Sequence, residues 1–369
     1  MIDRRNWLAG CGALVAGCVI LSGCGQGGSK TDGGAAQSST SGSGETRRVI
    51  ILTNGDDPFW DAMRAGMQDA EKELDLAKAG LKAELDKNDG TDKGQADKLQ
   101  QYANQTDIAA VAISVIDAKN VAVAEGMRKL QAQGIKVLTV DSDVDRDRSR
   151  DARFAYLGTD NIEGGRELGK AAKGLRPEGK YVCFVGHKSA ANAIERITGF
   201  AEGAGEKFAA AEDTLGDEMD LSVADRNVRD ALERHADLNV LVGIWAYNAN
   251  AISSTVKDRN VKDKTTVVVF DAAPKAITHM EAGLIDAMVV QNPYQMGFDA
   301  TKLMKAMIED DQTTIKSMLP DGDVIVTGLK VVVPDESSPL KKDMFSAGTE
   351  FLTLKEFKAW LDAKHLAGS

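Results

Sequence analysis

The chain is poor in cysteine and histidine, with four of each among its 369 residues. Three of the cysteines, Cys11, Cys18 and Cys24, fall within the first 24 residues, so Cys183 has no disulfide partner in the rest of the chain. No CxxC pair or Cys/His spacing typical of a metal site is present. We therefore expect no metal centre, and we expect Cys183, inside the apolar run YVCFVG, to be buried and inert.

Motifs of the common catalytic and nucleotide-binding sites are also absent. There is no GxxxxGKS/T phosphate loop, no GxGxxG after the first predicted strand, no GxSxG and no HExxH. Only His187, directly after a predicted strand, is placed to reach a cleft, and a single histidine there is more often a polar loop residue than a general base. These absences favour a binding protein without a cofactor over an enzyme.

Long basic stretches are missing too. The formal net charge is −11, with 56 acidic residues against 45 lysines and arginines. An acidic body repels a phosphate backbone, so we expect no nucleic-acid partner.

The N-terminus has the composition of a secretory signal peptide, residues 1–23. Arg4 and Arg5 precede the apolar run LAGCGALVAGCVI, which is shorter than the roughly 20 residues of a membrane-spanning helix. The following LSGC, ending at Cys24, resembles the lipobox of bacterial lipoproteins, in which the cysteine becomes the acylated N-terminus; the alternative is an ordinary signal peptide with an incidental cysteine. Residues 24–46 form a Gly/Ser-rich linker with almost nothing to bury, so we expect a flexible membrane tether.

The remaining body alternates short apolar runs with segments of helical period. Near-continuous apolar strands separated by helices are typical of parallel sheets covered on both faces. Some 320 residues exceed one comfortable core, and the series restarts once, so the sequence predicts two doubly wound α/β lobes. The expected strands are 49–54, 83–89, 111–116, 136–141 and 154–159, and then 181–186, 240–246, 267–272 and 287–292.

Polar residues follow nearly every predicted strand. Ligands of open parallel sheets bind beyond the carboxyl ends of the strands, so these positions are the candidates for a site. Each of them has an alternative role as a cap of the next helix. They include Asn54, Asp57, Asp141, Asp143, Asn248, Asp271 and Gln291.

Two adjacent aromatic residues, Phe59 and Trp60, stand out because aromatics make up only 5% of the chain. Asp57 and Pro58 before them are a good N-cap and first helical residue. Trp60 begins an apolar stripe that continues through Met63, Met67, Ala70 and Leu74 at helical spacing, which predicts that Trp60 is partly core. Phe59 lies off that stripe and is the stronger candidate for a ligand contact.

From Val49 to about Pro334 the chain resembles the ribose-binding-like branch of type I periplasmic binding proteins, the sugar-capturing components of ABC importers. The resemblance rests on seven stretches in the family's order, which are DPFWDAMRAGMQDAEKEL with its internal Gly66, KVLTVDSD, YLGTDNIEGGRELG, ERITGF, VGIWAYNANA, VVVFDAAP and VVQNPYQMG. It implies lobes formed by 47–159 with 293–325 and by 160–292 with 326–369. Three crossings would join them, near Thr159–Asp160, Gln291–Asn292 and Val326.

The same resemblance implies a shell of side chains around a small sugar or polyol. Phe59 and Trp60 would sandwich the ring, and Asp141 would accept hydrogen bonds from neighbouring hydroxyls. Further contacts would come from Asp57, Ser142, Arg196, Met219, Asn248, Asp271 and Gln291.

Two departures from the family pattern bear on the ligand. The chain has Asp57 where the family usually has asparagine, and Ser142 followed by Asp143 where it commonly has an arginine after the binding aspartate. The cleft would then hold Asp57, Asp141, Asp143 and Asp271 against Arg196 alone. Such a site suits donor-rich ligands such as polyols or amino sugars, or a bound cation.

The resemblance predicts a lipid-anchored, monomeric receptor outside the cytoplasm that closes its lobes on the ligand and delivers it to an ABC permease. One alternative is the same receptor serving a chemoreceptor or sensor kinase, and another is an extracytoplasmic sugar-modifying enzyme. The lactose-repressor type of regulator shares the fold but needs an N-terminal helix-turn-helix, where this chain has a signal peptide.

Overall fold

A computed structural model describes residues 46–320 and 322–369. The expected signal peptide, Cys24 and nearly all of the linker lie outside the described residues. Among the helices that are described, none combines the length and apolar character needed to cross a membrane.

The first sheet has six strands, and all neighbouring strands are parallel. Helices α1 (Phe59–Glu73) and α10 (Pro293–Glu309) cover one face, and α2 (Asp92–Tyr102) and α3 (Val121–Ala132) cover the other. Short helices α4 (Arg146–Ser149) and α11 (Gln312–Met318) and 3-10 turns at Leu76–Ala79 and Arg150–Ala152 complete this first lobe. The strand order is β12 (Val324–Val326), β5 (Tyr156–Gly158), β4 (Lys136–Val140), β3 (Ile108–Ile113), β1 (Arg47–Leu52) and β2 (Leu81–Asp86).

The second sheet is parallel except for its β11–β13 pair, which is antiparallel. Helices α5 (Asn161–Leu175) and α6 (Ala191–Ala204) cover one face. The other face packs on α7 (Leu221–Arg234), α8 (Asn248–Asp258), α9 (Pro274–Glu281) and α12 (Leu354–Ala363), and 3-10 turns lie at Lys262–Lys264 and Lys342–Met344. The strand order is β14 (Glu350–Thr353), β13 (Lys330–Val333), β11 (Ala287–Val290), β10 (Thr266–Phe270), β9 (Val240–Gly243), β6 (Gly179–Val185) and β7 (Phe208–Ala210), and β8 (Leu215–Gly216) also pairs with β6.

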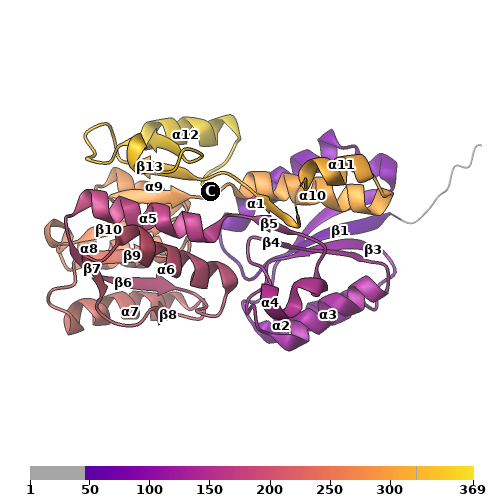
Figure 1. Ribbon diagram of the computed structural model, residues 1–369, viewed down its shortest axis with the longest axis horizontal. Helices are drawn as coiled ribbons and strands as arrows, with labels where there is room; N and C mark the ends of the chain where they lie inside the picture. The colour runs from indigo at the N-terminus through magenta and orange to yellow at the C-terminus, as the bar shows by residue number, and fades with distance from the viewer. Residues whose placement is uncertain (1–45, 321) are drawn as a thin grey trace, which may run out of the picture. The chain divides into compact units, whose positions relative to one another are not determined.

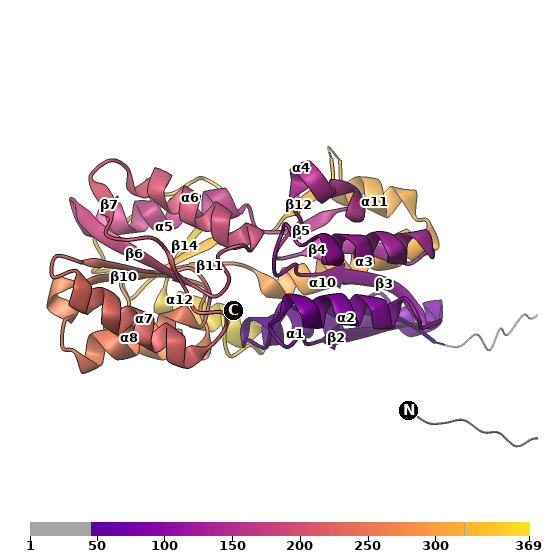
Figure 2. The ribbon, with the colours of Figure 1, turned by 90° about the horizontal axis from the view of Figure 1, so that it is seen from below.

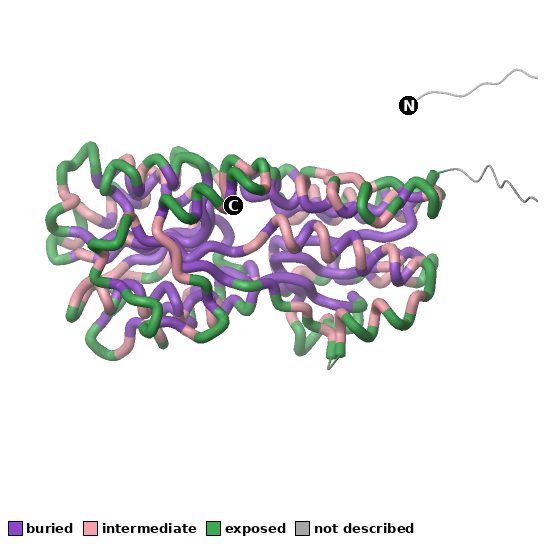
Figure 3. Tube along the Cα trace, turned by 90° about the horizontal axis from the view of Figure 1, so that it is seen from above, coloured by how far each residue is buried: buried purple, intermediate pink, exposed green. Residues whose placement is uncertain are grey.

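The two doubly wound sheets confirm the predicted fold class. Every residue of β3 and β10 is buried, as expected for strands covered on both faces, and Figure 3 shows the inner strands buried and the outer helix surfaces exposed. Cys183 on β6 is buried, and burial raises its pKa to about 12, which keeps the thiol unreactive. The sequence analysis did not predict β7, β8, β12, β13 or β14, which have two to four residues each.

The chain passes between the two lobes three times, after β5, after β11 and after β12. As a result α10, late in the chain, packs against α1 at its start (Figures 1 and 2). A Cβ on Gly66 of α1 would lie 1.8 Å from the carbonyl oxygen of Tyr294, so the internal glycine of the DPFW helix is required by this contact.

Helix α1 begins at Phe59, one residue later than the sequence suggested. The Asp57 carboxylate accepts a hydrogen bond from the Phe59 amide at 2.8 Å, so it satisfies one of the free amides of the first turn. The same contact fixes the direction in which the Asp57 side chain points.

The α5–α6 contact in the second lobe depends on Gly165. A Cβ on Gly165 would lie 2.2 Å from the carbonyl oxygen of Arg196, well inside any allowed contact. The absence of a side chain therefore lets α6 approach α5 closely, and this approach fixes the backbone of Arg196.

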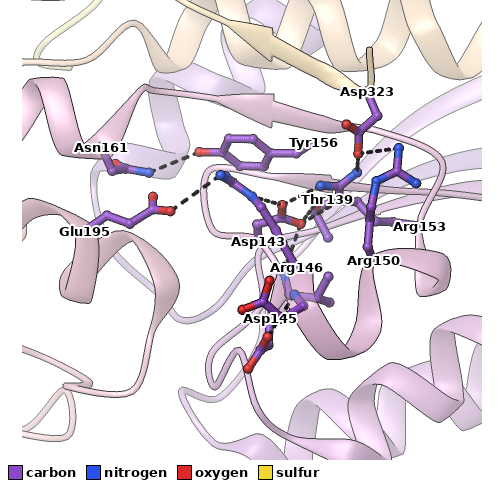
Figure 4. A network of polar contacts seen from close by, with 12 residues as sticks. Thr139, Asp143, Asp145, Arg146, Arg150, Arg153, Tyr156, Asn161, Glu195 and Asp323 are labelled. Atoms are coloured by element: carbon purple, nitrogen blue, oxygen red, sulfur yellow. Dashed lines mark hydrogen bonds and ion pairs between the residues drawn. The ribbon is translucent and has the colours of Figure 1, made fainter.

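Asp143 does not lie in a ligand cleft, so the expectation that it adds a fourth carboxylate there is wrong. Its carboxylate accepts hydrogen bonds from Arg153 Nε and Nη2, both at 2.7 Å, and from Arg146 Nε at 2.9 Å. Figure 4 shows Arg153 between Asp143 and Asp323, with Arg146 reaching toward both Asp143 and Glu195. Two guanidinium groups thus compensate its charge inside the first lobe.

Replacing Gly165 by alanine should destabilise the protein by about 1–3 kcal/mol, because the added methyl group forces α5 and α6 apart. Urea unfolding measures this loss. Gly348→Ala is the matched control, since a Cβ there meets nothing within 4 Å, and equal midpoints for the two variants would show that the α5–α6 contact tolerates the methyl group.

Replacing Asp143 by alanine should lower the free energy of unfolding by about 1.5–3 kcal/mol, because the buried Arg153 loses its hydrogen bonds to Asp143 and keeps only its pair with Asp323. The side chains of Asp143 and Arg153 are 1% and 0% exposed. The control is Asp151→Ala, whose pair with Arg128 is exposed and should contribute at most about 1 kcal/mol. Equal stability of both variants would contradict a structural role for Asp143.

Candidate functional site

A cavity lies between the lobes at the carboxyl ends of the strands, where the topology predicts a ligand. It contains about 340 Å³ of space not occupied by protein atoms, part of it open to solvent. We call it the polar cavity. It is lined by Asn54, Asp57, Phe59, Trp60, Asp141, Asn192, Arg196, Met219, Trp245, Ala246, Tyr247, Asp271 and Gln291.

Two aspartates occupy corresponding positions in the two lobes. Asp141 follows β4 and Asp271 follows β10, and both have left-handed backbones, with φ of 63° and 66°. Each donates its backbone N–H to the neighbouring strand, Asp141 to the Leu157 carbonyl at 3.0 Å and Asp271 to the Val289 carbonyl at 2.8 Å. Aspartate tolerates this conformation better than most residues, and it turns the carboxylate out of the sheet and into the cavity.

Hydrogen bonds within the protein hold both carboxylates in place. Asp141 accepts from Ser114 Oγ at 2.8 Å and, across the cleft, from Asn192 Nδ2 at 3.3 Å. Asp271 accepts from Gln291 Nε2 at 3.1 Å, and Gln291 in turn accepts from Thr159 Oγ1 at 2.7 Å. Thr159 and Gln291 both lie at crossings between the lobes, so the second carboxylate is connected to the hinge.

Arg196 supplies the positive charge of the polar cavity. Its Nε donates to Asn161 Oδ1 at 2.9 Å, its Nη1 donates to the Ile244 carbonyl at 3.1 Å, and its guanidinium lies 4.0 Å from the centroid of the Phe270 ring. Its Nη2 is buried without a hydrogen-bond partner and lies 3.8 Å from Asp141 Oδ1. A buried donor left free in this way is ready for an acceptor atom of a ligand.

The aromatic walls come from both lobes. Phe59 and Trp60 pack edge to face with ring centroids 5.0 Å apart, and both rings belong to the apolar core of the first lobe as well as to the cavity lining. Trp245 faces them from the second lobe and donates its Nε1–H to Asn192 Oδ1 at 3.2 Å. The rings provide flat apolar surfaces beside the carboxylates.

A second polar group supports the wall next to Met219. The Asp217 carboxylate accepts hydrogen bonds from the Tyr247 hydroxyl, from Asn248 Nδ2 and from the Met219 amide. Glu218 and Met219 both have left-handed backbones, with φ of 53° and 66°. This unusual turn places the Met219 methyl group against Gly55 of the first lobe.

Burial raises the pKa values of the acidic groups in and around the polar cavity. The pKa of Asp57 rises to about 6 and that of Asp271 to about 7, with burial as the main cause and the negative charge of Asp141 as a further one. Burial also raises the pKa of Asp141, against the opposing effect of Arg196. The pKa of Asp217 rises to about 6 for the same reason.

The structure brings eight of the ten residues predicted for the site to the cavity wall, namely Asp57, Phe59, Trp60, Asp141, Arg196, Met219, Asp271 and Gln291. The other two do not line it. Ser142 is fully buried, and Asn248 lies behind the wall, where it bonds Asp217 and the Trp245 amide.

Sequence reasoning missed Asn192, Trp245, Ala246, Tyr247 and the supporting Asp217. A signal existed for some of them. Asn192 precedes Arg196 by one helical turn and so shares its face, and Trp245 and Tyr247 lie in the same stretch as Asn248. Asp217 belongs to a loop whose position follows only from the pairing of β8 with β6.

No group of three or more His, Cys, Asp or Glu side chains arranged to hold a metal ion occurs in the described part of the chain. Of the described histidines, His187 bonds Glu218 through Nδ1 at 2.8 Å and does not line the polar cavity. The arrangement of carboxylates, amides, one guanidinium and aromatic faces is suited to binding a small polar molecule.

Comparison with known proteins identifies relatives of the chain. Residues 48–312 match the family model described as the periplasmic binding protein domain. The chain is 24% identical over 279 residues to the D-allose-binding periplasmic protein of Escherichia coli K12, covering 72% of this chain and 86% of that protein.

Solved structures show the same fold. An ABC transporter solute-binding protein from Burkholderia graminis in complex with D-arabinose has a TM-score of 0.68 and 25% identity, covering 81% of this chain and 99% of that one. Another from Agrobacterium vitis, with bound D-fucose, has a TM-score of 0.70 and 20% identity, covering 80% and 98%. Since the family model spans well over half of its length, the chain belongs to the periplasmic binding protein family.

Proposed function

We propose that the protein is an extracytoplasmic receptor that captures a small sugar or sugar-like polyol in the polar cavity and delivers it to an ABC importer. The observation that supports this most is that Asp141 and Asp271, two buried carboxylates from opposite lobes, line the same cavity. Aromatic faces and the free Nη2 of Arg196 lie beside them. The related D-allose-binding protein and the solved D-arabinose and D-fucose complexes support the same ligand class.

The proposed binding chemistry follows from these groups. Neighbouring hydroxyls of a sugar donate to the Asp141 and Asp271 carboxylates, and a ring or hydroxyl oxygen accepts from Arg196 Nη2. The C–H faces of the ring pack on Phe59, Trp60 and Trp245. Hydrogen bonds to charged groups contribute about 1.5–3 kcal/mol each, so a few of them reach the roughly 8 kcal/mol of a micromolar site.

Ligand contacts from both sides explain how binding favours the closed form. We propose lobes of residues 47–159 with 293–325 and of 160–292 with 326–369, which rotate about the three crossings. Asn192 donating to Asp141, and Arg146 lying 3.6 Å from Glu195, are direct contacts between them. A ligand bonded to both lobes adds to these contacts and shifts the population toward closure.

The proposal also includes the N-terminal segments of the chain and its partners. Residues 1–23 act as a signal peptide, Cys24 is lipidated, and residues 24–46 tether the monomeric body to a membrane, where a permease recognises the closed form. The receptor catalyses no reaction on its ligand.

A ligand screen tests the receptor function. We expect one pentose, hexose or polyol to raise the thermal midpoint of the body from Arg47 to Ser369, because binding to the folded state alone stabilises it. Asp141→Ala should lower the affinity for that ligand by about 10- to 150-fold in titration calorimetry, which is the contribution of one hydrogen bond to a charged group.

The matched control is Asp56→Asn, an exposed carboxylate that pairs with Lys87 and does not line the polar cavity. Its affinity should equal that of the wild type. No midpoint shift with any sugar or polyol would refute the proposal, and a shift with amino sugars or calcium alone would replace it by an amine or cation receptor.

The affinity for the sugar should rise with pH between 5 and about 7. Free Asp57 and Asp271 have pKa values of about 6 and 7, so both bind protons at pH 5. Hydroxyl donors favour the ionised carboxylates, so binding releases these protons and tightens as pH rises, by about tenfold per pH unit for each protonated group. Above pH 7.5 the affinity should level off.

Calorimetry from pH 5 to 8.5 measures this profile. Asp271→Asn should abolish the rise in affinity between pH 6 and 7 and reduce the rise below pH 6 from about a hundredfold to about tenfold per pH unit, the part that Asp57 contributes. A wild-type affinity that is constant from pH 5 to 7, or that falls, would mean that the ligand binds the neutral acids.

A further inference from the structure

An apolar groove opens beside the polar cavity. It lies between the corner before α1 in the first lobe and the starts of α7, α8 and α9 in the second, and it is walled by Pro58, Leu221, Ala246, Ala273, Pro274 and Ala276. Its space is about 990 Å³, part of it open to solvent, against about 340 Å³ for the polar cavity. We call it the apolar groove.

The groove adjoins the polar cavity. Asp57, Met219, Ala246 and Tyr247 line both spaces. A substituent that leaves a bound sugar ring on this side reaches the groove by passing between these four residues. The residues also come from both lobes, so an occupant of the groove adds contacts that favour the closed form.

The chemistry of the groove suits carbon rather than a second polar ring. Leu221 is 64% exposed although it is a large apolar side chain directly after the N-cap Asp220. Of the polar side chains at the rim, Asp56 pairs with Lys87 and Asn250 contacts His279 Nε2 at 3.2 Å, while Lys275 is exposed. An alkyl or aryl group in the groove would remove Leu221 and its apolar neighbours from water.

We propose that the physiological ligand is a sugar with an apolar substituent, an alkyl or aryl glycoside, whose sugar ring occupies the polar cavity and whose aglycone occupies the apolar groove. This inference rests on the proposed function. It adds the statement that the preferred ligand is the substituted sugar rather than the free one.

The test compares one sugar with its glycosides. The sugar with the largest midpoint shift in the screen is titrated against the protein, together with the α and β anomers of its methyl, butyl and phenyl glycosides and a disaccharide of the same sugar. Each methylene that is fully buried is worth about fourfold in affinity, so butyl should exceed methyl. Because the groove is partly open to solvent and the chain is only partly buried, one anomer of the butyl glycoside should bind at least about tenfold more tightly than the free sugar.

Variants at the rim of the groove test whether the gain in affinity comes from the groove. Leu221→Asp should reduce the tenfold advantage of the butyl glycoside to less than about threefold and leave the affinity for the free sugar unchanged, and Leu221→Met should retain the advantage. The matched control is Val121→Asp, since Val121 is 66% exposed and is also the first residue of a helix after its N-cap, yet lies in neither space.

The outcomes separate the two proposals. If the free sugar binds but no anomer of any glycoside binds more tightly, the proposed role of the apolar groove is refuted and the receptor function stands. An advantage that survives Leu221→Asp, or one that the disaccharide shares equally, also refutes the role of the groove. Failure of every sugar and glycoside to bind overturns both proposals.

Discussion

The burial of several carboxylates around one guanidinium is the constraint on which the rest of the structure depends. Asp57, Asp141 and Asp271 line a cavity whose one basic side chain among its lining residues is Arg196. Burying a charge is unfavourable unless hydrogen bonds compensate it, so each carboxylate has partners, and their pKa values are raised. The strand ends, the left-handed backbones and the hinge side chains all serve to hold these acceptors in place while leaving room for donors from a ligand.

The two lobes solve this problem in the same way. Asp141 and Asp271 follow parallel strands with similar backbone angles and similar hydrogen bonds to the neighbouring strand. What differs is the support behind them. Asp141 is bonded by Ser114 of its own lobe and by Asn192 of the other, whereas Asp271 is bonded by Gln291, which reaches Thr159 at another crossing. Asp141 is therefore hydrogen-bonded directly to the opposite lobe, and Asp271 is connected through Gln291 to the hinge.

Aspartates only two residues apart serve unrelated purposes. Asp141 faces the cavity, while Asp143 is bonded to Arg153 and Arg146 within the first lobe. Because successive side chains of an extended chain point to opposite sides, and because the turn after β4 reverses one of them, spacing alone could not separate the two roles. The consequence for the ligand is a less acidic cavity than the DSD stretch suggested, with three carboxylates instead of four, which suits a neutral sugar better than a cation.

The sequence by itself determined the fold class and most of the cavity wall. Uninterrupted apolar strands such as those around Val111 and Val268 can only be buried on both faces, and the polar residues that follow parallel strands must meet at one edge of the sheet. Only the tertiary structure decided that Asp143 pairs with Arg153 and that Asn248 and Asp217 lie behind the cavity wall. It also decided that Asn192 and Trp245 line the cavity. These placements depend on partners distant in sequence, Arg153, Tyr247 and Asp141 among them, whose approach is set by helix packing and hinge geometry rather than by local pattern.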